Sequence, residues 1–127
     1  QHHSDLFEKV DGVSNHEVAV DVALGREPEF PHREGPFRYA ACCWLRRYRD
    51  GVVERVPSEE EIAALEREIP GLIVEPHVAP GTRLSELTHQ ESYSYVLAVV
   101  YVGGEDPSSL LETYRKARRR LHFRFRD

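Results

Sequence analysis

The sequence predicts an α+β fold, in which two N-terminal helices precede an antiparallel sheet with two helices on one face. Two observations predict it. Strand-like segments, either apolar on both faces or alternating, occur at 37–48, 52–56, 72–78 and 92–102. Apolar residues at helical spacing occur at 58–69 and 106–121. The resulting order is strand, strand, helix, strand, strand, helix, with HFRFR as a short last strand, and it is related to the split βαβ pattern.

Two short helices are predicted within the first 30 residues. Asp5 to Val10 form the first, which ends at Gly12. Ser14 and Glu17 fit a capping box for the second, and Gly25 ends it. The apolar residues of this second helix leave it nearly apolar on two sides: Val18, Ala19, Val22 and Ala23. We therefore expect it to pack against another body, part of which lies outside this chain.

A connector is predicted between these helices and the sheet. Prolines, a glycine and charged residues follow one another at 31–36, a composition typical of irregular chain. The expected organisation is a helical segment at 1–30, the connector at 31–36 and an α+β subdomain at 37–127.

The two most apolar strand segments, 37–48 and 92–102, are both predicted to be interior strands. Each carries apolar residues on both faces, as is typical of a central strand. At an edge, one row of backbone amide and carbonyl groups would be exposed to water. Asp50-Gly51 is a hairpin turn signal, so 52–56 is expected to return as a half-buried strand. Pro76 places the far end of 72–78 at a sheet edge or bulge.

The two helices of the subdomain have clear start signals. Ser58 and Glu61 form a capping box before the first, while Asp106 caps the second and Pro107 occupies its first position. We expect both helices on the same face of the sheet. The predicted core residues are Trp44, Ile62, Leu65, Leu97 and Tyr114.

Composition bounds the function. The 127 residues are 40% apolar and 31% charged, as in an ordinary globular domain. A formal net charge of −5 argues against general affinity for nucleic acid or anionic membranes. No apolar run approaches the roughly 18 residues that span a bilayer. The N-terminus has neither an initiator Met nor a signal-type core, so we expect a trimmed cytoplasmic protein.

The cysteines and glycines favour structural interpretations. Cys42 and Cys43 are adjacent, so on a strand they would point to opposite faces, and we expect buried reduced thiols. Gly103-Gly104 lies between a strand and a helix without a following Lys-Ser/Thr, and it is interpreted as a turn. No nucleophile elbow, zinc spacing or dinucleotide fingerprint is present. No catalytic residue is therefore assigned within this chain.

Three other features have a functional and a structural interpretation. His77, His89 and Glu91 would meet around an ion only if their loop folded back, and we expect no metal site. The basic run from Arg115 to Arg126 would suit a phosphate, RNA or acidic partner, but it fits a solvated helix face better. The last feature is an aromatic ladder, expected to be sheet packing along one strand face: Tyr93, Tyr95 and Tyr101.

Two long segments carry a resemblance to a known family. The stretch PGLIVEPHVAPGTRLSELTHQESYSYVLAVVYVGGEDPSSLLETYRKARRRL resembles the C-terminal region of ATP-grasp carboxylate–amine ligases, most of all the amino-acid-ligase branch and more distantly biotin carboxylase. The upstream SDLFEKVDGVSNHEVAVDVALG resembles the helical pair that follows the metal-binding strand in that family. The chain departs from the family pattern at Leu111-Glu112, where Glu-Ala is usual, and in the longer polar loop from Pro80 to Glu91.

The resemblance implies a function. ATP-grasp ligases activate a carboxylate as an acyl-phosphate and let an amine-type nucleophile displace the phosphate. The lysines and the Glu-x-Asn motif that hold ATP and Mg²⁺ in the family lie N-terminal to the matched region, so this chain alone is expected to be inactive. The implied partners are the N-terminal part of the same ligase and its carboxylate and amine substrates, and a dimer is compatible with these expectations. The resemblance places four residues near the substrate: Gln1, His2, His3 and Ser4.

A second function of a different class stays open. The same fold pattern suits a free-standing ferredoxin-like interaction or regulatory module, whose exposed sheet face would bind a partner without catalysis. The apolar helix around Val18 to Leu24 favours the ligase, because such a helix needs a larger body to cover it.

Overall fold

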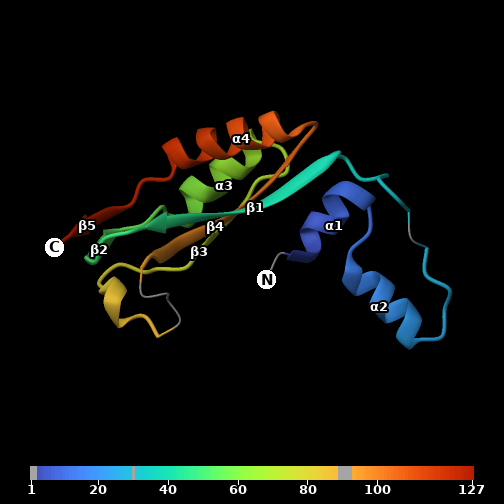
Figure 1. Ribbon diagram of the computed structural model, residues 1–127, viewed down its shortest axis with the longest axis horizontal. Coiled ribbons are helices and arrows are strands. Elements are labelled where there is room, and N and C mark those ends of the chain that lie inside the picture. Colours follow the sequence, from blue (N-terminus) through green and yellow to red (C-terminus); the bar gives the residue numbers. More distant parts are fainter. Residues whose placement is uncertain (1–2, 30, 89–92) are drawn as a thin grey trace.

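The computed structural model describes residues 3–29, 31–88 and 93–127 and has a mixed α+β architecture (Figure 1). The elements follow in this order: α1 (His3–Asp11), α2 (Asn15–Ala23), β1 (Tyr39–Arg47), β2 (Val52–Arg55), α3 (Glu59–Glu68), β3 (Ile73–Pro76), the 3₁₀ turn η1 (Leu84–Glu86), β4 (Tyr95–Gly104), α4 (Pro107–Arg120) and β5 (Arg124–Arg126). Among the described residues, no helix is both long enough and apolar enough to cross a bilayer.

The main sheet has three antiparallel strands in the order β1-β4-β3. The central place of β4 confirms the prediction for 92–102, and its residues from Leu97 to Gly104 are buried. The prediction that 37–48 is also interior is wrong, because β1 is an edge strand of this sheet. Its apolar residues on two faces have another cause: α4 contacts β1 as well as β4, and α1 also contacts β1 (Figure 1).

The predicted hairpin at Asp50-Gly51 is also wrong, because β2 pairs with β5 in a separate two-stranded sheet. The Asp50 carboxylate accepts hydrogen bonds from the Ser85 amide and hydroxyl, each at 2.9 Å, and from Arg83 at 3.1 Å. The Leu84 amide donates to the Gly51 carbonyl at 3.0 Å. These bonds tie the turn to the η1 region instead of closing it on β1. HFRFR does form the short last strand, as predicted.

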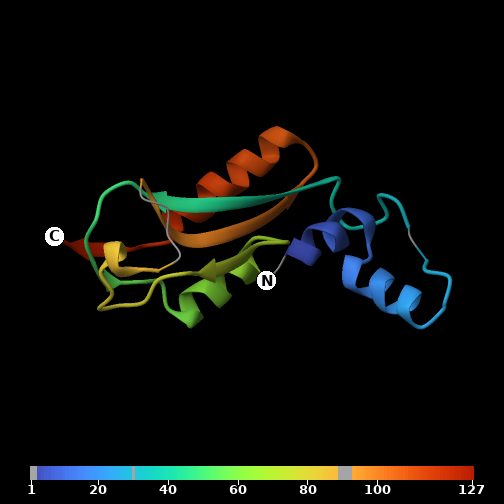
Figure 2. The ribbon, with the colours of Figure 1, turned by 60° about the horizontal axis from the view of Figure 1, so that its bottom comes forward.

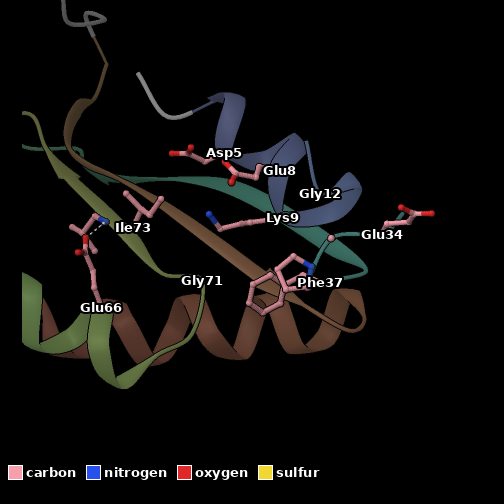
Figure 3. Close-up of a pocket in the computed structure, with 12 residues that line it drawn as sticks. Asp5, Glu8, Lys9, Gly12, Glu34, Phe37, Glu66, Gly71 and Ile73 are labelled. Carbon is pink, nitrogen blue, oxygen red and sulfur yellow. Dashed lines mark hydrogen bonds between the residues drawn. The ribbon is translucent and has the colours of Figure 1, made fainter. Parts of the chain in front are cut away.

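Helices α3 and α4 cover the same face of the main sheet, as predicted (Figures 1 and 3). They also contact each other, since Glu68 of α3 pairs with Arg120 of α4 at 2.7 Å and with Lys116 at 3.9 Å. Ile62, Leu65 and Leu97 are buried in the core, and Tyr114 packs against it. Trp44 was predicted to be buried but is 52% exposed. It pairs with Val99 in the register, on the face that α3 and α4 do not cover.

An irregularity in the β1–β4 register changes which side chains share a face. Leu45 pairs with Ala98, but the next residue, Arg46, pairs with Val96. The extra residue in β4 is a bulge, which shifts the alternation of side chains by one. Tyr95 therefore packs toward the α3/α4 core, whereas Tyr101 pairs with Cys42 on the other face. The predicted single-face tyrosine ladder is wrong for this reason.

The two cysteines point to opposite faces of β1, as predicted, since Cys42 pairs with Tyr101 and Cys43 with Val100. Neither forms a disulfide, and both are half-buried. Burial, followed by the charge of the Cys42 thiolate, raises the pKa of the Cys43 thiol.

Helices α1 and α2 lie to one side of the subdomain (Figure 2). Gly12 and Gly25 adopt positive φ after the two helices, and the Ser14–Glu17 capping box forms as predicted. Helix α1 contacts β1 and β4, while α2 contacts α1. Helix α2 has no buried residue, and Val20, Val22 and Leu24 are 55%, 61% and 59% exposed. The prediction that this helix needs a cover which the chain does not provide is consistent with that exposure.

Candidate functional site

A hollow of about 890 Å³ lies between α1, the strand β3 and the C-terminal part of α3 (Figure 3). Small-molecule sites typically enclose roughly 300–1,000 Å³, so the hollow has a suitable size. We call it the α1 hollow. It is lined by parts of α1, the connector, α3 and β3: Asp5, Glu8, Lys9, Gly12, Glu34, Gly35, Pro36, Phe37, Glu66, Gly71, Ile73 and Val74.

The connector reaches the hollow because it is bonded to the end of α1. The Gly35 amide donates to the Val10 carbonyl at 3.0 Å, and the Phe37 amide donates to the Lys9 carbonyl at 2.9 Å. A Cβ at position 35 would lie only 2.3 Å from the Lys9 carbonyl oxygen. Glycine is therefore required there, because any side chain would separate the connector from α1.

The Phe37 ring forms one end of the hollow and rests on two glycines. A Cβ added at Gly71 or at Gly103 would come within 2.6 Å of that ring. Gly71 also has a φ of +78°, so it combines a left-handed turn after α3 with close contact to an aromatic ring. The prediction that Gly103-Gly104 forms a turn is wrong, because both glycines are the last residues of β4 and pair with Ala40 and Tyr39 of β1.

Lys9 is the main polar feature of the hollow. It lies on the buried side of α1, three residues after Leu6, and is only 8% exposed. Its side chain runs past Gly71, and its amine points into the hollow (Figure 3). Burial lowers the pKa of this amine, while the negative charges of Asp5 and Glu8 act in the opposite direction. Within the described part of the chain, the amine makes no hydrogen bond or close ion pair.

Four carboxylates line the hollow, and the charges of two of them, Asp5 and Glu8, act on that amine. Asp5 and Glu8 precede Lys9 on α1, Glu34 comes from the connector, and Glu66 comes from α3. One Glu66 oxygen accepts a hydrogen bond from the Val74 amide at 3.0 Å, which fixes the side chain at the border of α3 and β3. Four carboxylates and one ammonium give the lining an acidic balance, and Ile73 and Phe37 add apolar surface.

Of the four residues predicted to lie near a substrate, two are among the described residues. Gln1 and His2 lie outside the described residues. His3 and Ser4 begin α1, the helix that carries Lys9 and Glu8 into the hollow. Of the metal candidates, His77 lies 3.4 Å from Glu75, and both His89 and Glu91 fall outside the described residues. In the part of the chain that is described, no group of three or more potential metal ligands comes together.

The C-terminal basic run extends over α4 and β5, and several of its exposed side chains pair with acidic residues. Besides Arg120 and Lys116, Arg124 contributes a pair with Glu54 at 3.0 Å. This arrangement matches the structural interpretation of the run, a solvated face.

Sequence reasoning missed Lys9. A usable signal existed, because Leu6, Lys9, Val10 and Val13 follow helical spacing and place the lysine on an otherwise apolar stripe. A lysine at such a position is uncommon in a core, and its burial indicates either a partner or a ligand.

Comparison with known proteins gives no family assignment. No protein-family model matches the sequence, and no protein of curated function matches it.

Proposed function

We propose that this chain is the C-terminal substructure of an ATP-grasp ligase, which joins a carboxylate to an amine-type nucleophile through an acyl-phosphate. The supporting observation is that apolar side chains are exposed on two sides of α2: Val20 and the cap residue Leu24 lie on one side, and Val22 lies on the opposite side. Fully burying one such side chain is worth about 1.5–3 kcal/mol. Because each is more than half exposed, covering α2 would gain roughly 1 kcal/mol or more per residue.

The proposed cover is the ATP-binding lobe of the same polypeptide. The resembling helical pair of the family belongs to that lobe, and α2 has the capped, regular form of a helix that is ready to pack. ATP and Mg²⁺ would be held by the lobe, through lysines and a Glu-x-Asn strand just before Gln1. We assign no ATP or Mg²⁺ ligand to this chain. ATP as substrate also favours the cytoplasm as its location.

The decisive experiment compares two proteins in the same assay. The 127-residue chain should show no change in melting temperature with Mg-ATP. The longer protein from the same gene should be stabilised, by about 2.7 kcal/mol at a hundredfold excess over Kd. With its carboxylate and amine substrates, the longer protein should also release ADP and phosphate. A reading frame that begins at or near Gln1 would overturn the ligase proposal.

A second candidate function is supported by a different observation. Trp44 is exposed on the open sheet face, and the guanidinium of Arg46 lies 4.8 Å from the centre of its ring. Tryptophan and arginine are enriched in protein-binding hot spots, and β1 is an edge strand of the main sheet. This surface would suit a non-catalytic interaction module. Absence of Mg-ATP stabilisation in both proteins would favour it over the ligase.

A further inference from the structure

The α1 hollow contains a charged amine, that of Lys9, which no hydrogen bond or close ion pair satisfies among the described residues. Lys9 is only 8% exposed as a residue, its amine points into the hollow, and no hydrogen bond or close ion pair joins that amine to another described residue. An ammonium that is partly withdrawn from water and has no bonded acceptor is less stable than one that is fully hydrated or hydrogen-bonded. A site of this kind is stabilised when a bound anionic group supplies the missing acceptors.

The rest of the lining restricts what that ligand can be. Glu8 lies on the same helix as Lys9, and Glu66 faces the hollow from α3 (Figure 3). With Asp5 and Glu34, these carboxylates would repel a simple anion and attract a cationic group. Ile73, Pro36 and Phe37 offer apolar surface to the body of a small molecule. The lining therefore suits a molecule that carries both charges.

We propose that the α1 hollow binds a small zwitterion of the amino-acid type, with its carboxylate on the Lys9 amine and its ammonium against Glu66 and Glu8. Glu66 is preoriented, because one of its oxygens already accepts from the Val74 amide and the other can accept from a ligand. The proposal does not depend on ligase activity, because the site lies within this chain and binding requires no ATP.

The chain has a feature that makes the test clean. It contains two lysines, Lys9 and Lys116, and the second is exposed on α4. Labelling lysine with ¹⁵N therefore gives two side-chain amine signals by NMR, which Lys116→Met assigns. Each standard amino acid is then added in turn to the 127-residue chain.

We expect at least one amino acid to shift the Lys9 signal in a saturable manner and to leave Lys116 unmoved. The bound carboxylate should also raise the pKa of Lys9, a change that a merely structural lysine would not show. For the amino acid that binds, the deaminated acid and the decarboxylated amine serve as matched probes. Each should bind about tenfold to a hundredfold more weakly, since each loses one charged contact.

Two variants separate the contacts. Lys9→Met should remove the preference for the zwitterion over the decarboxylated amine. Glu66→Gln keeps an oxygen for the Val74 amide and should remove the preference for the zwitterion over the deaminated acid. Lys116→Met should leave affinity unchanged.

Three outcomes would overturn the proposal. These are a Lys9 signal that no amino acid moves, equal binding of the deaminated acid, and unchanged affinity in Lys9→Met. If Lys9→Met fails to fold, the probe comparison on the unmodified chain still decides.

Discussion

The exposure of α2 predicts that substitutions on this helix affect stability differently in the 127-residue chain and in the longer protein. Val20→Thr and Val22→Thr keep the side-chain shape and the β-branch, so helix propensity scarcely changes. Both valines are more than half exposed in this chain, and the new hydroxyls stay hydrated. The double variant should therefore change the free energy of unfolding by no more than about 0.5 kcal/mol.

In the longer protein, the same change should be costly. If the lobe covers both sides of α2, each hydroxyl loses water without gaining a partner, which costs about 1–3 kcal/mol per residue. The pair should then destabilise the longer protein by roughly 2–6 kcal/mol. Val100→Thr on β4 is the matched control, because Val100 is fully buried and should cost about 1–3 kcal/mol in both proteins.

Urea unfolding followed by circular dichroism measures these differences, and an unchanged m-value shows that the midpoints reflect stability. If the double substitution lowers the free energy of unfolding of the 127-residue chain by more than about 1 kcal/mol, α2 is already covered in that chain. Equal, small effects in both proteins would mean that α2 stays exposed, and the proposed packing against an ATP-binding lobe would be refuted.

Three further predictions concern stability, pH and reactivity. Gly103→Ala should destabilise the chain by about 1–3 kcal/mol in thermal or urea unfolding, because the added Cβ meets the Phe37 ring. Adding Phe37→Leu to this variant should recover part of the lost stability. Unchanged stability of Gly103→Ala would contradict the packing of Phe37 on Gly103. Desolvation raises the pKa of Asp50, but hydrogen bonds from Gly51, Ser85 and Arg83 outweigh it and lower that pKa from 3.8 to about 2. The stabilisation from Asp50 should thus be present above pH 3.8 and lost as the pH falls through about 2, so the stability gap between the chain and Asp50→Asn should close across that window; a constant gap would refute the assignment. Cys42 should react with iodoacetamide before Cys43, because burial raises the pKa of the Cys43 thiol. Mass spectrometry of the partly modified chain measures this order, and earlier modification of Cys43 would contradict the prediction.

The local signals in the sequence predicted most elements well. The capping boxes at Ser14 and Ser58, and Asp106 followed by Pro107, mark helix starts through bonds within four residues. Such contacts depend on the adjacent chain alone. The central position of β4 was also predictable, because burial on both sides leaves a continuous apolar run.

The errors concern contacts between distant segments. The β1 segment has the composition of an interior strand, yet two helices on opposite sides, not two strands, account for its apolar faces. Asp50-Gly51 has the composition of a hairpin turn, but Ser85 and Arg83, more than 30 positions away, direct the chain elsewhere. The bulge that separates Tyr95 from Tyr101 depends on the register with β1, which no local pattern in β4 reveals.

The candidate site was less predictable than the fold. The α1 hollow is assembled from α1, the connector, α3 and β3, and no single one of these segments has a recognisable binding motif. Lys9 becomes significant only when Gly35 and Phe37 bring the connector against the end of α1 and enclose its side chain.

The close approach of Gly35 to α1 has a consequence for motion. Two amide hydrogen bonds, from Gly35 and Phe37, join the helical pair to the connector that leads into β1. These two bonds hold the helical pair against the α+β subdomain. Breaking them would release α1 from the sheet and open the hollow to solvent. Hydrogen exchange at these two amides therefore reports the docking of the helices directly. Any ligand that bridges α1 and β3 should slow exchange at both amides together, because it holds α1 against the sheet.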